Sequence, residues 1–130
     1  MPPGLLFAAA SGEQTGGMSQ YIIYFNQQWV GDHSPEWFAE RGPLANAVVE
    51  DMRDAGVLVF AAGVDEDVNE AITADGAGGA IEFRRGIYAA REQYIGGLTI
   101  VDVADEDAAR MWGGRIAEAC GWPQQIRRVY

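Results

Sequence analysis

The sequence predicts a single domain of the α+β class. Two segments space their apolar residues as the buried stripe of a helix does, and the segments around them have the β-branched and aromatic composition of strands. Their order is strand, helix, hairpin strands, long strand, helix and strand, which is an α+β order. With 130 residues, 48% of them apolar, the chain can bury one core without disulfides or metal ions.

The start of the chain does not share this pattern. Residues 1–17 show no sustained periodicity and no charged n-region, and the apolar run 5–10 is short for a signal peptide. We therefore expect a flexible leader over 1–17 and the α+β domain over 18–130, for which Met18 would be a natural start.

The first strand is expected over 20–26, where apolar residues occupy both alternating faces, as inside a sheet. After a loop over 27–33, Ser34 and Pro35 form a helix start. Serine caps the first free N–H groups, and proline lacks an N–H that would have no helical partner there. The first helix therefore begins at about Pro35.

The buried stripe of this helix comes from apolar residues four positions apart, namely Leu44, Val48 and Met52. Gly56 then ends the helix. Gly42 and Pro43 interrupt it earlier. Because a proline ring clashes with the preceding helical turn, we expect a short turn from Pro35 and a new helix after Pro43.

Short strands are expected next. Residues 57–62 form an apolar run of strand type, and residues 68–74 show the alternation of a strand. The turn 75–79 contains three glycines, which adopt positive φ at no steric cost, so residues 80–84 return as a hairpin partner.

The clearest core strand spans 94–103, ten residues rich in β-branched and aromatic types, and we expect it at the centre of the sheet. It leads into a second helix over 105–120, which Asp105 can cap and Gly121 stops. A last strand over 124–130 has arginines between its apolar residues, which suits a sheet edge.

Charge limits the partners that this domain can have. The net charge of −10 would repel a phosphate backbone, so we predict no nucleic-acid partner. The composition is that of a soluble protein, and we predict no membrane partner. Cys120 is the only cysteine and cannot form an intramolecular disulfide, which fits a cytoplasmic location.

We predict no metal and no cofactor. Residues 65–69 begin like a calcium loop, but Glu70 stands where that loop needs glycine, and Gly76 stands where it needs a bidentate glutamate. A zinc site draws on several histidines and cysteines, and this chain has one of each. The glycines of the 75–79 turn lack the lysine and hydroxyl of a phosphate loop.

Two side chains are candidates for acid-base chemistry. His33 has an ordinary pKa near neutrality and follows Asp32, whose carboxylate could orient it as a general base; the alternative is an exposed loop histidine. Glu92 is the second candidate catalytic group. The serines lie near the start of the chain or at a helix cap, so covalent catalysis is not expected.

Candidate ligand-binding residues lie around the segment from Arg85 to Glu92, which combines a glycine turn, an aromatic ring and guanidinium groups beside the long strand. We predict a pocket there. Arg85 could hold a small anionic ligand in a bidentate grip, or it could form an ion pair with Glu92 or Glu82. The predicted ligand-binding residues are Trp37, Arg85, Tyr88 and Arg91.

Several stretches, in chain order, carry a resemblance to a known family: YIIYF, SPEWFAERG, MRDAGVLVFAAGV and AITADGAGGAIEFRRGIYAAREQYIGGLTIVDVADEDAARMW. From Tyr21 onward the chain resembles the YCII-related domain family, in particular its DGPF branch of small uncharacterised bacterial proteins. RGIYA falls where that branch carries Asp-Gly-Pro-Phe. Gly86 and Tyr88 keep the glycine and an aromatic, whereas Arg85 replaces the aspartate and Ile87 the proline.

The resemblance implies a ferredoxin-like fold of the dimeric α/β-barrel type, with an antiparallel sheet and two helices on one face. It implies a small-molecule-binding domain that could act as a non-covalent enzyme, by proton transfer or isomerisation; the alternative is a non-catalytic binding or regulatory accessory domain. A homodimer also follows from the residues. Two helices cover one sheet face, whereas strands 20–26 and 94–103 offer apolar side chains to both.

Overall fold

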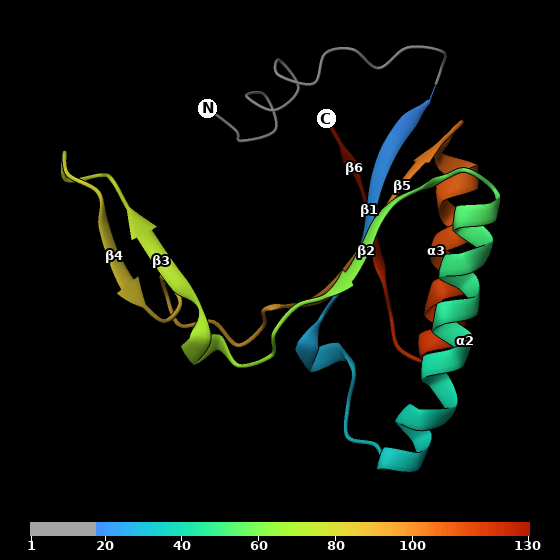
Figure 1. Cartoon of the computed structure of the whole chain (residues 1–130), viewed down its shortest axis with the longest axis horizontal. Helices are drawn as coiled ribbons and strands as arrows, with labels where there is room; N and C mark the ends of the chain where they lie inside the picture. The colour runs from blue at the N-terminus through green and yellow to red at the C-terminus, as the bar shows by residue number, and fades with distance from the viewer. Residues whose placement is uncertain (1–17) are drawn as a thin grey trace.

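Residues 18–130 are described by a computed structural model, in which two helices cover one face of a four-stranded sheet and a two-stranded hairpin extends away from it (Figure 1). The predicted leader, residues 1–17, falls outside the described residues. The elements are β1 (Ser19–Asn26), η1 (Gln27–Trp29), α2 (Pro35–Asp54), β2 (Leu58–Gly63), η2 (Val68–Glu70), β3 (Ile72–Asp75), β4 (Glu82–Arg85), β5 (Ile95–Val103), α3 (Glu106–Cys120) and β6 (Gln125–Val129).

The main sheet has the strand order β2-β5-β1-β6, and each neighbouring pair is antiparallel. This topology confirms the predicted α+β class and is compatible with a ferredoxin-like fold. The long strand β5 lies in the interior of the sheet beside β1, as the sequence predicts, and β6 lies at one edge. Among the described residues, no helix is long and apolar enough to cross a membrane.

The core lies between the sheet and the two helices. Alternate residues of β1 and β5 point to the helix side, so Ile23 and Val101 are fully buried there together with Met52 of α2. Helix α3 packs closely over β6 because Gly113 has no side chain: a Cβ at that position would lie 2.5 Å from Cδ1 of Ile126. Only a close approach of this kind lets α3 cover the edge of the sheet.

Helix α2 corrects one prediction. It runs without a break from Pro35 to Asp54, although Pro43 lies inside it. Pro43 and Ala39, whose carbonyl loses its helical donor, are both exposed, so water can bond that carbonyl. The turns after Pro43 are held by Val48 and Met52 in the core. The expected break was therefore wrong, because packing on one side outweighs a lost bond on the other.

The segment predicted as one strand over 68–74 is divided in the structure. Its first part is the short helix η2, where the side chain of Asp67 accepts a 3.0 Å hydrogen bond from the N–H of Asn69. Only the second part is a strand, β3. The cap at Asp67 competes locally with strand formation. The other predicted strands and helices begin and end within two residues of their predicted bounds.

Strands β3 and β4 form an arm, which we define as residues 72–88. They pair with each other and not with the main sheet. In Figure 1 the arm projects away from the sheet on the side opposite the helices. None of its residues is buried, and all of its large apolar side chains except Ile87 are 62–72% exposed. The exposed ones are Ile72, Ile81, Phe83 and Tyr88.

The sheet face opposite the helices is the open face. No helix of the described residues covers it (Figure 1). The strand register places Ile22 opposite Ile100, Tyr24 opposite Leu98, and Phe60 opposite Ile100 on its other side. The open face is therefore lined by a continuous apolar group, Ile22, Tyr24, Phe60, Leu98 and Ile100.

Candidate functional site

His33 and Trp37 lie together at the start of α2. Their rings stack with centroids 3.6 Å apart and planes 9° from parallel, and the Arg41 guanidinium lies 4.6 Å from the Trp37 ring. His33 Nε2 is 3.0 Å from the carbonyl oxygen of Val30. A carbonyl can only accept, so Nε2 carries the proton and Nδ1 is the basic nitrogen. The backbone, and not the carboxylate of Asp32, therefore orients this histidine.

Arg85 leaves the end of β4 and reaches the short helix η2. Its guanidinium donates a 3.1 Å hydrogen bond to the carbonyl oxygen of Glu70 and lies 4.0 Å from the Glu70 carboxylate. Its acidic partner is thus Glu70, where the sequence suggested Glu92 or Glu82. Both side chains of this pair are more than 60% exposed, so solvent weakens it to about 1 kcal/mol or less.

Tyr88 and Arg91 lie in the connection between β4 and β5. Tyr88 is exposed, and the Arg84 guanidinium lies 5.7 Å from its ring and donates to its carbonyl oxygen. Arg91 donates a 3.4 Å hydrogen bond to the neighbouring carbonyl of Ala90, and no ion pair of the described residues includes it. Neither Arg84 nor Arg91 therefore has a carboxylate partner among the described residues, whereas Arg85 has Glu70.

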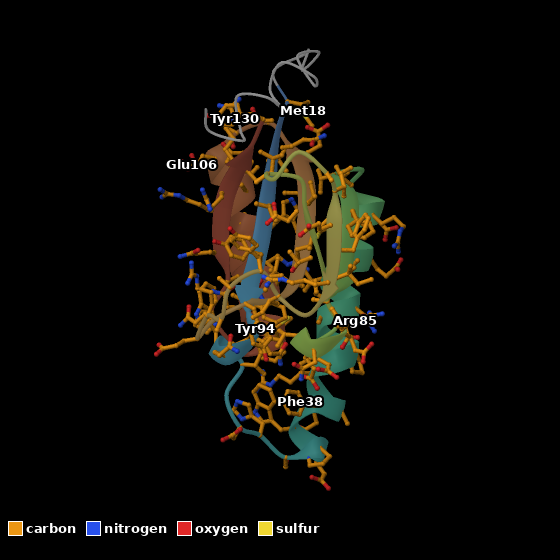
Figure 2. All side chains as sticks on the ribbon, turned by 90° about the vertical axis from the view of Figure 1, so that its left-hand side faces the viewer. Met18, Phe38, Arg85, Tyr94, Glu106 and Tyr130 are labelled. Atoms are coloured by element: carbon orange, nitrogen blue, oxygen red, sulfur yellow. The ribbon has the colours of Figure 1, made fainter. Side chains whose placement is uncertain are left out.

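The predicted site residues fall into two separate groups. No hydrogen bond or ion pair of the described residues joins His33 or Trp37 to the segment that holds Arg85, Arg91 and Glu92. Figure 2 shows Phe38, the neighbour of Trp37, at the lower end of the domain, below Arg85. Of four cavities on the described part of the chain, none is lined by His33 or Glu92.

A cavity does lie beside the Arg85–Glu92 segment, with a volume of about 260 Å³. Ile87 of that segment lines it together with Tyr94 and Ile95 at the start of β5. Three acidic residues that precede β3 also line it, namely Asp65, Asp67 and Glu70. No basic residue lines this cavity, so a positive group for an anion has to come from the arginines beside it.

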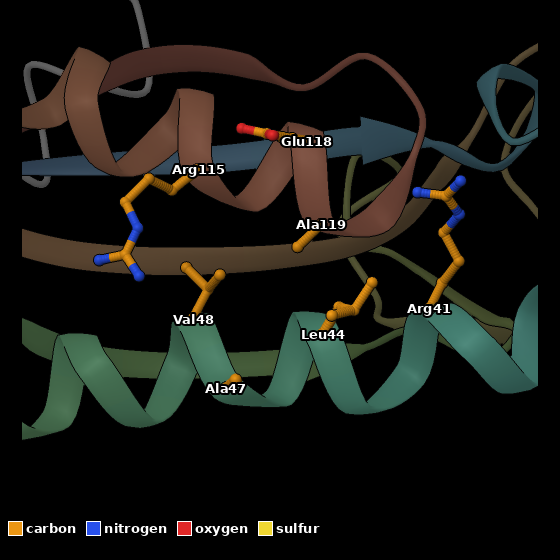
Figure 3. Close-up of a pocket in the computed structure, with 7 residues that line it drawn as sticks. All are labelled: Arg41, Leu44, Ala47, Val48, Arg115, Glu118 and Ala119. Carbon is orange, nitrogen blue, oxygen red and sulfur yellow. The ribbon is translucent and has the colours of Figure 1, made fainter.

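A second hollow lies between the two helices on the surface away from the sheet (Figure 3). It has a volume of about 410 Å³, and the short side chains of Ala47 and Ala119 open it. Its two arginines are already engaged. Arg115 forms an ion pair with Asp51, and Arg41 lies on the ring of Trp37. The third charged residue of the lining, Glu118, is in no ion pair of the described residues, so this groove offers a free carboxylate and no free positive charge.

A third hollow, the inner cavity, lies beneath α2 and has a volume of about 320 Å³. Its lining comes from α2, β1, β2, β5 and the end of α3, and the residues are Phe25, Ala45, Asn46, Val49, Ala61, Ala62, Gly63, Gly97, Leu98, Thr99, Ile116, Cys120, Trp122 and Gln124. None of them is charged. Short side chains and glycines leave the space that larger residues would fill.

Three residues of this lining, Thr99, Cys120 and Trp122, hold polar groups away from solvent. The indole Nε1 of Trp122 is buried without a hydrogen-bond partner, an arrangement that costs about 1–3 kcal/mol. Thr99 is the buried polar residue of the described chain, at 6% exposure. Cys120 is a free, buried cysteine, and burial raises the pKa of its thiol. The residues around the inner cavity therefore carry neutral polar groups, and the buried N–H of Trp122 has no acceptor among the described residues.

Sequence reasoning did not assign any role in a site to Thr99 or Trp122. Trp122 follows the glycine that ends α3, so the sequence marks it only as part of a helix stop. The run of small residues from Ala61 to Gly63 is the one signal of a space next to β2. No sequence pattern tells whether an indole N–H finds an acceptor, because its neighbours come from distant elements.

No family model matches the sequence, and no curated protein matches it. The resemblance to the YCII-related domain family accordingly stays a prediction.

Proposed function

We propose that this chain is a small-molecule-binding domain of the YCII-related type, in its DGPF branch, that works as a homodimer of the dimeric α/β-barrel kind in the cytoplasm. Its ligand would be a small anion, bound beside the Arg85–Glu92 segment. Two features support this, the open face and the local gathering of arginines. The single observation that carries ligand binding is the unpaired guanidinium of Arg91.

The open face supports the dimer. Phe60 is 53% exposed in the single chain, and its neighbours on β5 and β1 extend the apolar group across the sheet. Monomers rarely leave a contiguous patch of this kind in water. A second copy turned by a twofold axis would present the same apolar group, so each face would cover the other.

The arm also favours a second copy of the chain. Ile72, Ile81, Phe83 and Tyr88 are 62–72% exposed in the single chain, and a two-stranded hairpin is marginally stable alone in water. A partner copy on the open face lies on the side toward which the arm projects (Figure 1). The arm would then pack against the partner and bring Arg91 near the interface of the dimer.

The charge distribution supports an anionic ligand. Three of the nine basic residues of the chain lie between positions 84 and 91, although the chain has a net charge of −10. Arg85 is engaged by Glu70, and Arg84 donates to two backbone carbonyls, whereas Arg91 makes only one 3.4 Å bond to its neighbouring carbonyl and is the most available to grip a carboxylate or phosphate. Asp65, Asp67 and Glu70 line the neighbouring cavity, so an anion would bind at the arginines and not inside that cavity.

Binding without catalysis is the form of this function that the geometry favours. A general base must come within hydrogen-bond reach of the bound molecule. His33 stacks on Trp37 at the start of α2 and Glu92 is exposed, and neither lines one of the four cavities. We therefore favour a non-catalytic binding or regulatory domain over an enzyme that catalyses proton transfer or isomerisation.

Calorimetry with acetate, benzoate and inorganic phosphate tests the ligand. We expect at least one anion to bind, and Arg91→Gln to weaken it about tenfold or more, since a charged hydrogen bond contributes about 1.5–3 kcal/mol. Arg85→Gln should weaken it less, because Glu70 already engages Arg85. Arg110→Gln is the matched control, an exposed arginine paired with Glu106 on α3. Binding of no anion by the parent chain, or equal losses in all three variants, would exclude this site.

Light scattering tests the dimer. Phe60→Glu places a carboxylate in the open face and should give a monomer at micromolar concentration, where the parent chain is a dimer. Leu44→Glu is the matched control, because Leu44 is 52% exposed but lies on the helix side. A parent chain that is monomeric, or a Phe60→Glu variant that stays dimeric, would contradict the proposal.

A further inference from the structure

We infer that the ligand of this domain is a zwitterion with an apolar side chain, in which an ammonium group stands one carbon atom away from the anionic group, as in the apolar α-amino acids. This inference rests on the proposed function, because the anionic end of the molecule is the anion bound by the arginines. It adds a second part to that site, the cavity of about 260 Å³ beside the Arg85–Glu92 segment, which we call the junction cavity.

The junction cavity lies where the arm joins the main sheet. Most of its lining comes from residues 64–71, which connect β2 to β3, and the rest comes from the chain that returns from the arm to β5 (Figure 1). These two connections are bonded to each other at both ends. At the sheet, the N–H of Val64 donates a 2.9 Å hydrogen bond to the carbonyl oxygen of Gly96, and at the arm, the N–H of Gly86 donates a 2.6 Å bond to that of Ala71. Backbone bonds therefore fix the walls of the cavity.

The apolar part of the lining sets the size of the ligand body. Val68, Ile87 and Tyr94 are half-buried, and Val64 and Ile95 add apolar side chains that are more exposed. An apolar cavity of about 150 Å³ is large enough for a benzene ring, so a volume of about 260 Å³ accommodates a branched chain of about four or five carbon atoms. Burial of such a chain favours binding in proportion to its apolar area.

The charged residues that line the junction cavity are all acidic. Asp65, Asp67 and Glu70 are exposed, which places their carboxylates toward solvent at its mouth, and no basic residue of the described chain lines it. Asp65 and Asp67 each accept a backbone hydrogen bond through Oδ1, and no hydrogen bond of the described residues uses their Oδ2 atoms. An ammonium group at the mouth would thus find charged acceptors.

Positive charge adjoins this acidic mouth. The Arg85 guanidinium lies 3.1 Å from the carbonyl oxygen of Glu70 and 4.0 Å from its carboxylate, so it borders a lining residue directly. Arg91 stands in the chain between two lining residues, Ile87 and Tyr94, and its Cα is at most about 11 Å from that of Tyr94. A long arginine side chain covers a large part of that distance. Acceptors for an ammonium group and donors for a carboxylate therefore meet at one place, as the two charged groups do in an α-amino acid.

The net charge of the chain favours the same class of ligand. At −10 the protein repels a free anion at long range, whereas a zwitterion has no net charge to be repelled. Close to the site, the ammonium group would offset the repulsion between the anionic end and the acidic lining. A zwitterion is thus compatible with both the arginines and the carboxylates beside them.

Calorimetry with four matched compounds tests this inference on the parent chain. L-Leucine has all three parts of the ligand, 4-methylpentanoate lacks the ammonium group, 3-methylbutylamine lacks the carboxylate, and glycine lacks the apolar body. We expect L-leucine to bind most tightly. Each compound without one charge should bind about tenfold or more weakly, and glycine about a hundredfold more weakly. Arg91→Gln should weaken L-leucine and 4-methylpentanoate by similar factors and leave 3-methylbutylamine unchanged.

Variants of the first connection locate the ammonium group and the body. Asp67→Asn removes a lining carboxylate but keeps an oxygen for the backbone bond, and it should weaken L-leucine about three- to tenfold without weakening 4-methylpentanoate. Glu66→Gln is the matched control, because Glu66 is an exposed acid beside it that does not line the cavity. Ala71→Leu fills the cavity and should remove the advantage of L-leucine over glycine, whereas Ala74→Leu, at an exposed alanine of β3 outside the lining, should not.

The outcomes separate this inference from the anion site. Equal binding of L-leucine and 4-methylpentanoate, or equal losses in Asp67→Asn and Glu66→Gln, would overturn the zwitterion and leave the anion site in place. The same holds if the chain binds acetate or phosphate but not L-leucine. Equal binding of L-leucine and 3-methylbutylamine would overturn the inference and also contradict the anion site, because the carboxylate would contribute nothing. If neither anions nor amino acids bind, the proposed function fails first. The comparison of the four compounds needs no variant, so it stands even if a variant does not fold.

Discussion

The body of the domain and its arm are built from the same kinds of residue but differ in what surrounds them. In the body, β1 and β5 each have strand neighbours on both sides and helices over one face, and Ile23 and Val101 are fully buried. In the arm, β3 and β4 have only each other, and Phe83 is 72% exposed. An apolar or aromatic residue type in a strand thus does not predict whether the side chain is buried, because burial depends on what packs against that strand.

This difference separates two sources of stability. The body buries its core with contacts of its own chain, so it should stay folded as a monomer, and pairing of the open faces would add stability that rises with protein concentration. The arm has no comparable contacts within the chain, and its order should rise with any partner that covers it. Paired substitutions, one in each region, test this contrast in the Phe60→Glu background, which we expect to be monomeric.

The largest difference is expected for large apolar side chains. Met52→Ala empties a fully buried position of the core and should lower the free energy of unfolding by about 2–5 kcal/mol. Phe83→Ala in the arm should change it by less than about 0.5 kcal/mol, as exposed substitutions do. Urea unfolding followed by circular dichroism measures both. Similar losses for the two variants would show that the arm folds as part of the body.

Glycines should show the same contrast at a smaller scale. Gly113→Ala puts a Cβ within 2.5 Å of Ile126 and should cost about 1–3 kcal/mol, since α3 must move away from β6. Gly78→Ala in the arm turn meets nothing within 4 Å and should be close to neutral. Thermal unfolding of the two variants and the parent chain measures this difference. A Gly113→Ala variant with the melting temperature of the parent would contradict the close contact between α3 and β6.

Burial in the body should also make stability depend on pH. Burial raises the pKa of the Cys120 thiol in the folded chain above its ordinary value of 9.0, so the unfolded thiol ionises first as pH rises. Its contribution is therefore complete below about pH 9 and is lost as pH rises further, by at most about 1.4 kcal/mol per pH unit. Urea unfolding from pH 7 to 10 should show this decline in the parent chain and a shallower one in Cys120→Ala. Equal slopes would contradict it.

The smallest effects are expected at capping aspartates. Asp105 accepts a 2.8 Å hydrogen bond from the N–H of Ala108 at the start of α3, and Asp105→Ala should cost about 1 kcal/mol. Asp75 accepts a similar bond, 2.9 Å, from the N–H of Ala77 at the arm turn. Asp75→Ala should leave the unfolding of the body unchanged and instead speed amide hydrogen exchange within the arm. Slow exchange in the arm of the monomer would refute its independence.

The sequence predicts the body better than it predicts the arm. Residues 94–103 read as a central strand because β-branched and aromatic types fill both faces, and β5 follows this pattern. Asp105 and Gly121 mark α3 because caps are local and need few other contacts. The helix break predicted at Pro43 was wrong because the ring of a proline acts only on the turn before it. The continuity of α2 depends on contacts made by Val48 and Met52 with distant elements.

The candidate site could be predicted only as separate segments. The sequence locates Arg85, Arg91 and Glu92 in one connection, and the structure places a cavity beside it. Neither the partner of Arg85 nor the distance of His33 from this connection has a sequence signal, because both depend on how η2 and the start of α2 are placed in space. The unpaired N–H of Trp122 depends on five elements that meet at the inner cavity, and no local pattern records it.

The two edges of the main sheet have a consequence for how large an assembly of this chain can grow. At one edge, Arg127 and Arg128 of β6 place positive charge along the strand, and at the other, the pairing of β2 shifts between Leu58 and Phe60. Charge and irregular pairing both oppose the addition of further strands. Growth of a continuous ribbon of sheets is thereby blocked, so self-association is directed to the open face. Each copy has one such face, and once two copies have joined there, no template for a third remains.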